Sequence, residues 1–137
     1  MEWMLMPLKR YADFSGRSRR KEYWMFTLGS VIVSVILYGI IGASIGLGNP
    51  EDTGSLALMS GAGIILLIFA VAIFIPSLAV QVRRFHDQDK SGWFILLNLV
   101  PYVGWIVVLV MMCIDGTRGP NRFGADPKGE DHSQIFA

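Results

Sequence analysis

Three long apolar stretches without Asp, Glu, Lys or Arg divide the chain, and they cover residues 25–47, 56–82 and 93–114. None of them has the polar face that a helix on the surface of a soluble protein needs. About 20 helical residues cross a hydrocarbon core of about 30 Å, so each stretch is long enough to span a bilayer. The pattern predicts an all-α membrane protein, a bundle of three transmembrane helices.

The polar residues lie in segments that flank this membrane domain of residues 25–114. Residues 1–24 form a basic segment interleaved with aromatic side chains, which predicts that it lies along the membrane interface. Turn residues and two carboxylates occupy 48–55, and a short polar connector occupies 83–90. Residues 115–137 contain Gly and Pro and no helix-length apolar pattern, so a polar C-terminal tail is expected.

Prolines interrupt two of the apolar stretches. Pro76 removes one helical hydrogen bond, which predicts a kink or a change to interfacial helix near the end of the second stretch. Residues 101–104, Pro-Tyr-Val-Gly, lie near the middle of the third stretch. They predict a bend or, as the less favoured alternative, a re-entrant hairpin.

Small residues form a stripe along the first stretch, at Gly39, Gly42 and Gly46. This spacing permits close approach of a second helix, either within the chain or from another copy in a homo-oligomer. The single cysteine, Cys113, ends the third stretch and cannot form an intramolecular disulfide. We interpret it as a small apolar or lipid-facing residue.

Composition and charge agree with a membrane protein and predict its orientation. The chain is 53% hydrophobic and 17% charged, whereas soluble domains average about 45–50% and about 25%. Of the 12 Lys and Arg residues, six precede the first stretch, three follow the second, three lie in the tail, and the 48–55 loop has none. The positive-inside rule then predicts a cytoplasmic N-terminus, a periplasmic 48–55 loop and, for three spans, a periplasmic C-terminus.

Three polar motifs resemble domain-of-unknown-function family 805, whose members are small bacterial inner-membrane proteins. The first is the run RYADFSGRSRRKEYW at residues 10–24, and the second is RRFHD at 83–87 with SGW at 91–93. The third is NRFGADP at 121–127. The likeness covers residues 8–128 and implies a multi-pass protein of the bacterial inner membrane. It implies no reaction, and the departures at Phe85, Asp89 and Ala125 leave the Arg-Arg and His-Asp positions intact.

Catalytic or metal chemistry has one weak candidate in the sequence. His86, Asp87 and Asp89 offer one imidazole and two carboxylates, but no second His or Cys has ligand spacing. We favour helix capping by Asp87, Asp89 or Ser91 and interfacial packing of His86. Residues 115–118, Asp-Gly-Thr-Arg, are interpreted as a turn after the third helix. No catalytic residue, metal ligand or cofactor is predicted.

The function favoured by these patterns is a non-enzymatic scaffold or accessory protein that contacts anionic lipid headgroups or a membrane-protein partner. Arginines beside the apolar stretches are the natural groups for headgroup phosphates, and nucleic acid is not expected as a partner. The open alternative is a lipid- or headgroup-processing enzyme, or a small-molecule export component, built from the polar motifs. The candidate binding residues are Arg17, Arg19, Arg20, Arg83, Arg84, His86, Asp87, Asn121, Arg122 and Asp126.

Overall fold

The structure of this protein is a computed structural model, and it describes residues 2–47 and 53–129. Helix is the regular secondary structure of this described part, apart from one isolated bridge between Asn121 and Gly124. The elements are α1 (Glu2–Lys9), α2 (Arg20–Leu47), α3 (Thr53–Asp87), the 3-10 helix η1 (Gly92–Leu99) and α4 (Val103–Cys113). The predicted all-α class is therefore confirmed.

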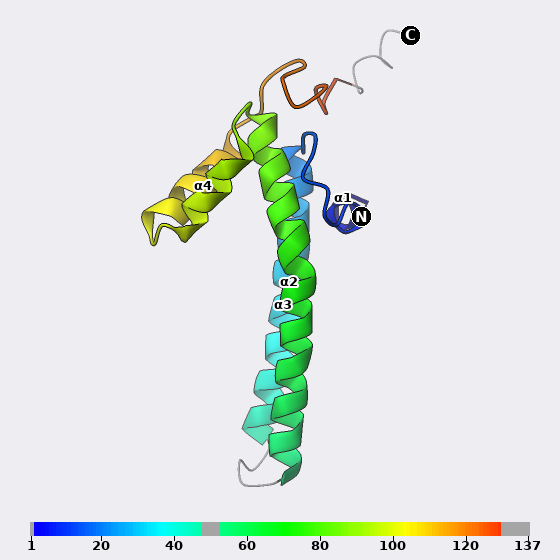
Figure 1. The fold of residues 1–137 in the computed structure, drawn as a ribbon. Coiled ribbons are helices and arrows are strands. Elements are labelled where there is room, and N and C mark those ends of the chain that lie inside the picture. Colours follow the sequence, from blue (N-terminus) through cyan, green and yellow to red (C-terminus); the bar gives the residue numbers. More distant parts are fainter. Residues whose placement is uncertain (1, 48–52, 130–137) are drawn as a thin grey trace.

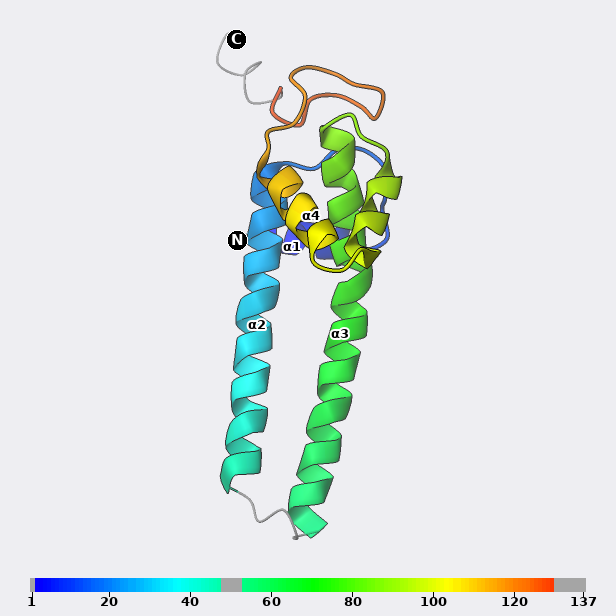
Figure 2. The same ribbon diagram turned by 90° about the vertical axis from the view of Figure 1, so that its left-hand side faces the viewer.

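Two long antiparallel helices, α2 and α3, lie side by side and form the length of the molecule (Figures 1 and 2). They have 28 and 35 residues, which at 1.5 Å per residue gives about 42 and about 52 Å. Both are long and apolar enough to cross a membrane. α3 continues as one helix through Pro76, so a change to interfacial helix does not occur there.

Most apolar side chains along α2 and α3 point away from the rest of the chain. Val35 is 64% exposed on α2, and Leu67 is 64% exposed on α3. Exposed apolar surface of this extent is rare on a soluble monomer. These helices thus expose the continuous apolar surface that their hydropathy predicts.

The third apolar stretch is a hairpin, so the predicted single helix over 93–114 is wrong. η1 runs away from the end of α3, and α4 returns beside it, so that both outer ends of the apolar hairpin (residues 92–114) lie at the same end of the molecule (Figure 2). α4 has 11 residues, or about 16 Å, about half of a bilayer core. The less favoured alternative of the sequence, a hairpin at Pro101, is the one observed.

Pro101 and Gly104 explain why the hairpin turns where it does. The ring of Pro101 disfavours helix at the preceding residue, and Val100 is extended, with φ −83° and ψ 115°. A Cβ on Gly104 would lie 1.8 Å from the carbonyl oxygen of Leu97, so η1 and α4 approach this closely only with glycine. Ser91 caps the other end of η1 by accepting a hydrogen bond from the Trp93 N–H, which confirms the capping role expected for this residue.

The hydrophobic core lies where the hairpin meets the end of α3. Phe85, Val108, Met111 and Met112 are buried together. Tyr23 and Trp24 of α2 and Ile95 and Leu97 of η1 pack against them. The short helix α1 lies across the long helices at this same end (Figure 1). Its Met4 contacts α2 at Gly29, where a Cβ would come within 2.7 Å of the Met4 methyl carbon.

Candidate functional site

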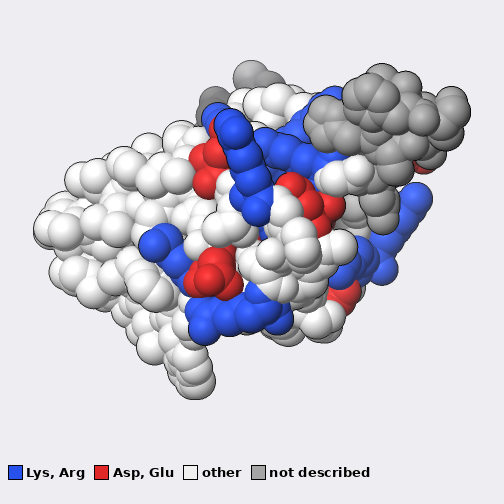
Figure 3. Space-filling model, turned by 90° about the horizontal axis from the view of Figure 1, so that it is seen from above, with Lys and Arg blue, Asp and Glu red and all other residues white. Residues whose placement is uncertain are grey.

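All the buried charged side chains of the described residues belong to one region, the polar cap (residues 10–22, 83–91 and 115–129). They are Arg17, Glu22, Arg83, Arg84 and Asp87. Seen from above the cap, Lys and Arg side chains alternate with Asp and Glu, whereas the side formed by the hairpin is nearly free of charge (Figure 3). The cap is therefore the polar end of an otherwise apolar molecule.

Asp87, at the end of α3, lies between two guanidinium groups. Arg17 Nη2 is 2.9 Å from Asp87 Oδ1, and Arg84 Nη1 donates to Asp87 Oδ2. The side chains of Arg17, Arg84 and Asp87 are 2%, 0% and 5% exposed. An unpaired charge at this depth would cost several kcal/mol, so the three groups need one another. Asp87 is consequently engaged as an ion-pair partner on both oxygens.

A second buried ion pair joins α2 to α3. Arg83 Nη2 lies 3.1 Å from Glu22 Oε1, and the two side chains are 0% and 4% exposed. Arg83 Nη1 also donates to the carbonyl oxygen of Asp13, at 3.2 Å. The α2–α3 contact at the cap is thus an ionic one, in contrast to the apolar surfaces of the same helices farther down.

Arg17 also fixes the tail to the cap. Its Nη1 donates to the carbonyl oxygen of Gly119 at 2.6 Å, and its Nη2 donates to that of Thr117. The Thr117 N–H donates back to the carbonyl oxygen of Asp87 at 2.8 Å. One guanidinium thereby connects the loop before α2, the end of α3 and the tail.

His86 provides the other tail contact. Its ring stacks on Phe123, with centroids 3.9 Å apart and planes 5° apart. Nδ1 of His86 lies 3.2 Å from the carbonyl oxygen of Gly16, and Asn121 Nδ2 donates to the carbonyl oxygen of His86 at 2.8 Å. His86 is therefore packed within the cap, against the tail and next to Gly92 at the start of the hairpin.

These contacts overturn two expectations. The tail does not lie at the opposite end from the N-terminal segment, because the third apolar stretch turns back and returns residues 115–129 to the cap. Arg83 and Arg84 are not headgroup anchors, because both are fully buried and bind Glu22 and Asp87. The sequence separates Arg83 from Glu22 by 61 positions and Arg17 from Gly119 by 102, and hydropathy along the chain does not detect such pairing.

The other predicted site residues lie nearer the surface or apart from the cap. Arg19 donates to the carbonyl oxygen of Pro127, Arg20 pairs with Asp115, and Arg122 pairs with Asp89. On α2, a Cβ at Gly39 or Gly42 would meet nothing within 4 Å, so no other part of the described chain packs there. Gly46 lies among residues whose side-chain surroundings the structure does not describe.

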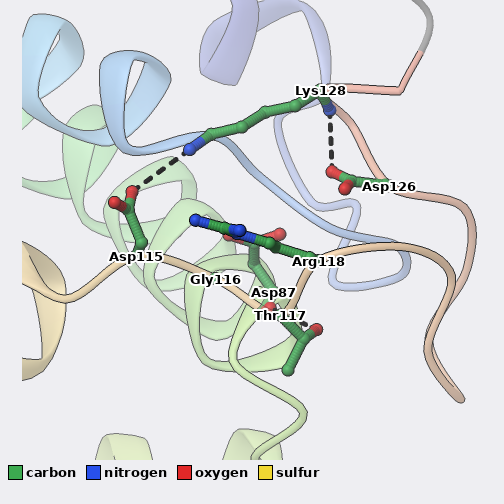
Figure 4. A pocket seen from close by; sticks show the side chains of 7 residues that line it. All are labelled: Asp87, Asp115, Gly116, Thr117, Arg118, Asp126 and Lys128. Atoms are coloured by element: carbon green, nitrogen blue, oxygen red, sulfur yellow. Dashed lines mark hydrogen bonds and ion pairs between the residues drawn. The ribbon is translucent and has the colours of Figure 1, made fainter.

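A pocket of about 490 Å³ opens between the tail and the end of α3. It is lined by Asp87, Asp115, Gly116, Thr117, Arg118, Asp126 and Lys128 (Figure 4). Asp115 Oδ1 binds both Lys128 Nζ and Arg20 Nη1, each at 3.1 Å. A Cβ on Gly116 would fall 1.9 Å from Asp87 Oδ2, so glycine is required for the tail to pass over Asp87.

Hydrogen bonds and cations keep the two outer carboxyls of this pocket ionised. The N–H groups of Lys128 and Gly119 and the Arg17 guanidinium hold the pKa of Asp126 below its ordinary value. Lys128 and Arg20 likewise lower the pKa of Asp115. Both carboxylates are thus negative at neutral pH and balance part of the positive charge around the pocket.

Sequence reasoning missed Glu22, Arg118 and Lys128. Glu22 had a signal, since it is a carboxylate at the start of an apolar helix and no other charged residue follows it in that helix. The tail residues had none, because their place beside Asp87 depends on the hairpin. Among the described residues, no three His, Cys, Asp or Glu side chains form a group that could hold a metal ion.

Two long apolar helices with an ion-paired polar cap at one end are the features of a small helical membrane protein. The chain belongs to the family described as "Protein of unknown function (DUF805)", whose family model matches residues 11–125. This confirms the resemblance drawn from the three polar motifs. Those motifs supply the Arg17, Asp87 and Asp126 side chains that meet in the cap.

Relatives in Escherichia coli (strain K12) match nearly the full length. Inner membrane protein YhaH is 44% identical over 130 residues, which cover 95% of this chain and 99% of the relative. Inner membrane protein YhaI is 45% identical over 128 residues, which cover 93% of this chain and 97% of the relative. A more distant relative, the uncharacterized protein YiiR, is 29% identical over an alignment of 145 residues that covers 83% of this chain and 85% of the relative. No solved structure matches the chain.

Proposed function

We propose that this protein is a multi-pass inner-membrane scaffold that crosses the bilayer with α2 and α3 and binds anionic lipid at its cytoplasmic face. The names of YhaH and YhaI, both inner membrane proteins, support the membrane location. The two apolar helices of spanning length support the crossing. The hairpin then enters the bilayer and leaves on the same side, since each arm is about half as long as the core is thick.

The distribution of basic residues supports a cytoplasmic cap. All 12 Lys and Arg residues lie in α1 or in the polar cap, and residues 48–55, between the first two apolar stretches of the sequence, include none. With the tail at the cap, the charge asymmetry is stronger than a three-span arrangement allows. The positive-inside rule therefore favours a cytoplasmic N-terminal segment and a cytoplasmic tail.

The observation that carries the scaffold function is the internal use of the buried charges. Arg17, Arg83 and Arg84 bind Asp87 and Glu22 and hold four chain segments together. A cap stabilised in this way presents a fixed surface to its surroundings.

Three lysines mark the border between that polar surface and the apolar one, and they form the basic rim (Lys9, Lys21 and Lys90). Lys9 ends α1, and Lys21 lies at the start of α2, with its Nζ 5.6 Å from the centre of the Trp3 ring. Lys90 precedes the hairpin and lies 5.7 Å from the centre of the Phe94 ring. A lysine beside an aromatic ring at such a border suits the headgroup layer, where each basic residue contributes about 1 kcal/mol of attraction to an anionic surface.

The convergence of the three polar motifs also favours a second candidate function, a headgroup-processing enzyme whose substrate enters the 490 Å³ pocket. We rank it second because Asp87, the buried carboxylate at that pocket, already binds two guanidiniums.

Unfolding of the purified protein in dodecyl maltoside micelles tests lipid binding. We expect added phosphatidylglycerol to raise the midpoint of thermal unfolding more than phosphatidylcholine does, and salt to weaken the difference. Replacing the rim lysines by glutamine (Lys9→Gln, Lys21→Gln and Lys90→Gln together) should remove most of that difference. Equal stabilisation by the two lipids in the wild type would refute the lipid-binding proposal.

Cysteine labelling tests the orientation separately. In a Cys113→Ser background, an impermeant thiol reagent applied to intact spheroplasts should label Glu51→Cys and leave Lys128→Cys unlabelled. Permeabilised cells should label both and serve as the control. Labelling of Lys128→Cys from outside would place the tail in the periplasm and refute the proposed orientation.

A further inference from the structure

The geometry points to a binding site for a phosphate-bearing ligand in the pocket between the tail and the end of α3. Arg118 and Lys128 are its anion-binding groups. The inference deepens the proposed function, on which it rests for the position of the pocket at the membrane face. It adds a defined site to the diffuse attraction of the basic rim.

The charge around the pocket favours an anion. Three carboxylates line it, from Asp87, Asp115 and Asp126. Five cationic side chains line the pocket or pair with these carboxylates, and they are Arg17, Arg20, Arg84, Arg118 and Lys128. The carboxylates therefore leave two positive charges without compensation. Arg17 and Arg84 are buried and are balanced by Asp87 and by Asp126, whose Oδ1 lies 4.0 Å from Arg17 Nη2. The surplus therefore lies on Arg20, Arg118 and Lys128, which have only Asp115 among these carboxylates to balance them.

Arg118 is the cation placed to use that surplus. Its side chain is exposed and has no hydrogen bond or ion pair within the part of the chain that the structure describes. It extends across the pocket toward Asp115 (Figure 4). A guanidinium donates two parallel hydrogen bonds to a phosphate, which an exposed arginine without an internal acceptor is free to do. Lys128, whose Nζ lies 3.1 Å from Asp115 Oδ1, supplies a second positive charge.

The volume sets the size of the ligand. About 490 Å³ lies within the range of about 300–1,000 Å³ that is typical of small-molecule sites. This exceeds the space that a bare phosphate ion needs, and it accommodates a phosphomonoester or phosphodiester with a polar substituent. A lipid headgroup and a soluble phosphorylated compound share this chemistry.

Calorimetric titration of the purified full chain in dodecyl maltoside micelles tests the site with two probes. Glycerol 3-phosphate represents a soluble ligand, and dihexanoyl phosphatidylglycerol represents a lipid headgroup. We expect Arg118→Gln to weaken binding of the preferred probe at least tenfold. Arg122→Gln removes the same charge from an exposed arginine elsewhere in the tail, and it should change the affinity less than twofold.

A second variant, expected to strengthen binding, keeps the test valid even if Arg118→Gln does not fold. Asp115→Asn removes the carboxylate that holds Arg20 and Lys128, so it should strengthen binding severalfold. Binding of glycerol 3-phosphate would assign a soluble ligand, and binding of the lipid alone would assign a headgroup. Both results support the site.

The inference would be overturned if neither probe bound to the wild type. It would also be overturned if Arg118→Gln and Arg122→Gln weakened binding equally. Failure here is distinct from failure of the proposed function. If phosphatidylglycerol still stabilises the wild type and the rim variant abolishes that effect, the scaffold proposal stands without this site. Conversely, if probe binding depends on Arg118 but the rim variant behaves like the wild type with lipid, the site stands and lipid binding by the rim lysines is refuted.

Discussion

Replacing Glu22 and Arg83 by methionine, separately and together, measures how the buried ion pair holds α2 to α3. Each single change leaves one charge buried without its partner, because the Arg83 and Glu22 side chains are 0% and 4% exposed. Removing one partner of a buried pair typically costs 3–5 kcal/mol, and we expect about that loss in the free energy of unfolding for Glu22→Met and for Arg83→Met.

The double variant should be far less damaging than the sum of the two. Methionine is unbranched, matches glutamate in length and leaves no buried charge at either position. The double variant loses the hydrogen bond from Arg83 to the Asp13 carbonyl oxygen, which is worth about 1 kcal/mol. It also removes Arg83 Nε, a buried donor without an acceptor among the described residues. The expected cost is about 1 kcal/mol, which with single costs of about 3–5 kcal/mol each gives a coupling energy of at least about 5 kcal/mol.

Unfolding in mixed dodecyl maltoside and sodium dodecyl sulfate micelles, followed by tryptophan fluorescence, supplies the four free energies of the cycle. A matched control is the exposed pair Arg122–Asp89, whose disruption by Arg122→Gln should cost less than 1 kcal/mol. Additive single effects within about 0.5 kcal/mol would refute the reasoning, because they would mean that the two charges do not interact.

Further predictions concern the tail. Gly116→Ala should destabilise the cap by more than 2 kcal/mol, because its Cβ would collide with Asp87. Gly39→Ala, where a Cβ meets nothing, should change stability by less than about 1 kcal/mol in the same unfolding assay. The pKa of Asp126 is depressed in the folded protein, so tail docking should be intact above pH 3.8 and weaken as the pH falls through the lower folded value. Hydrogen exchange of residues 116–128 should report this loss, and Asp126→Asn should show the weaker docking already at neutral pH. Phe123→Ala removes the stack on His86 and should speed exchange in the tail without changing α2 and α3; unchanged exchange would mean that the stack does not hold the tail.

Part of the site follows from residues that are close in sequence. The order Arg83, Arg84, His86, Asp87 at the end of an apolar stretch marks a polar helix end, and all four side chains do lie in the cap. The two arginines bind carboxylates in the structure, whereas the sequence favours headgroup contacts for arginines next to an apolar stretch. The partner carboxylate of Arg83 is Glu22, 61 positions away, and no local pattern shows such a distance.

The sequence by itself determined the helical class, the two long apolar helices and the family. Each depends on short-range properties, namely the length of an apolar run, the absence of charge within it and the local motifs. The turn at Pro101 belongs here too, because proline restricts its own neighbour.

Only the tertiary structure decided where the third stretch goes and what the buried arginines bind. A bent helix and a hairpin have the same hydropathy, and the choice depends on the contact of Gly104 with Leu97. Once the hairpin returns the tail to the cap, Thr117 and Gly119 supply carbonyl oxygens to Arg17 across 100 or more positions. Burial makes these pairings obligatory, since a guanidinium withdrawn from water must find its acceptors within the protein.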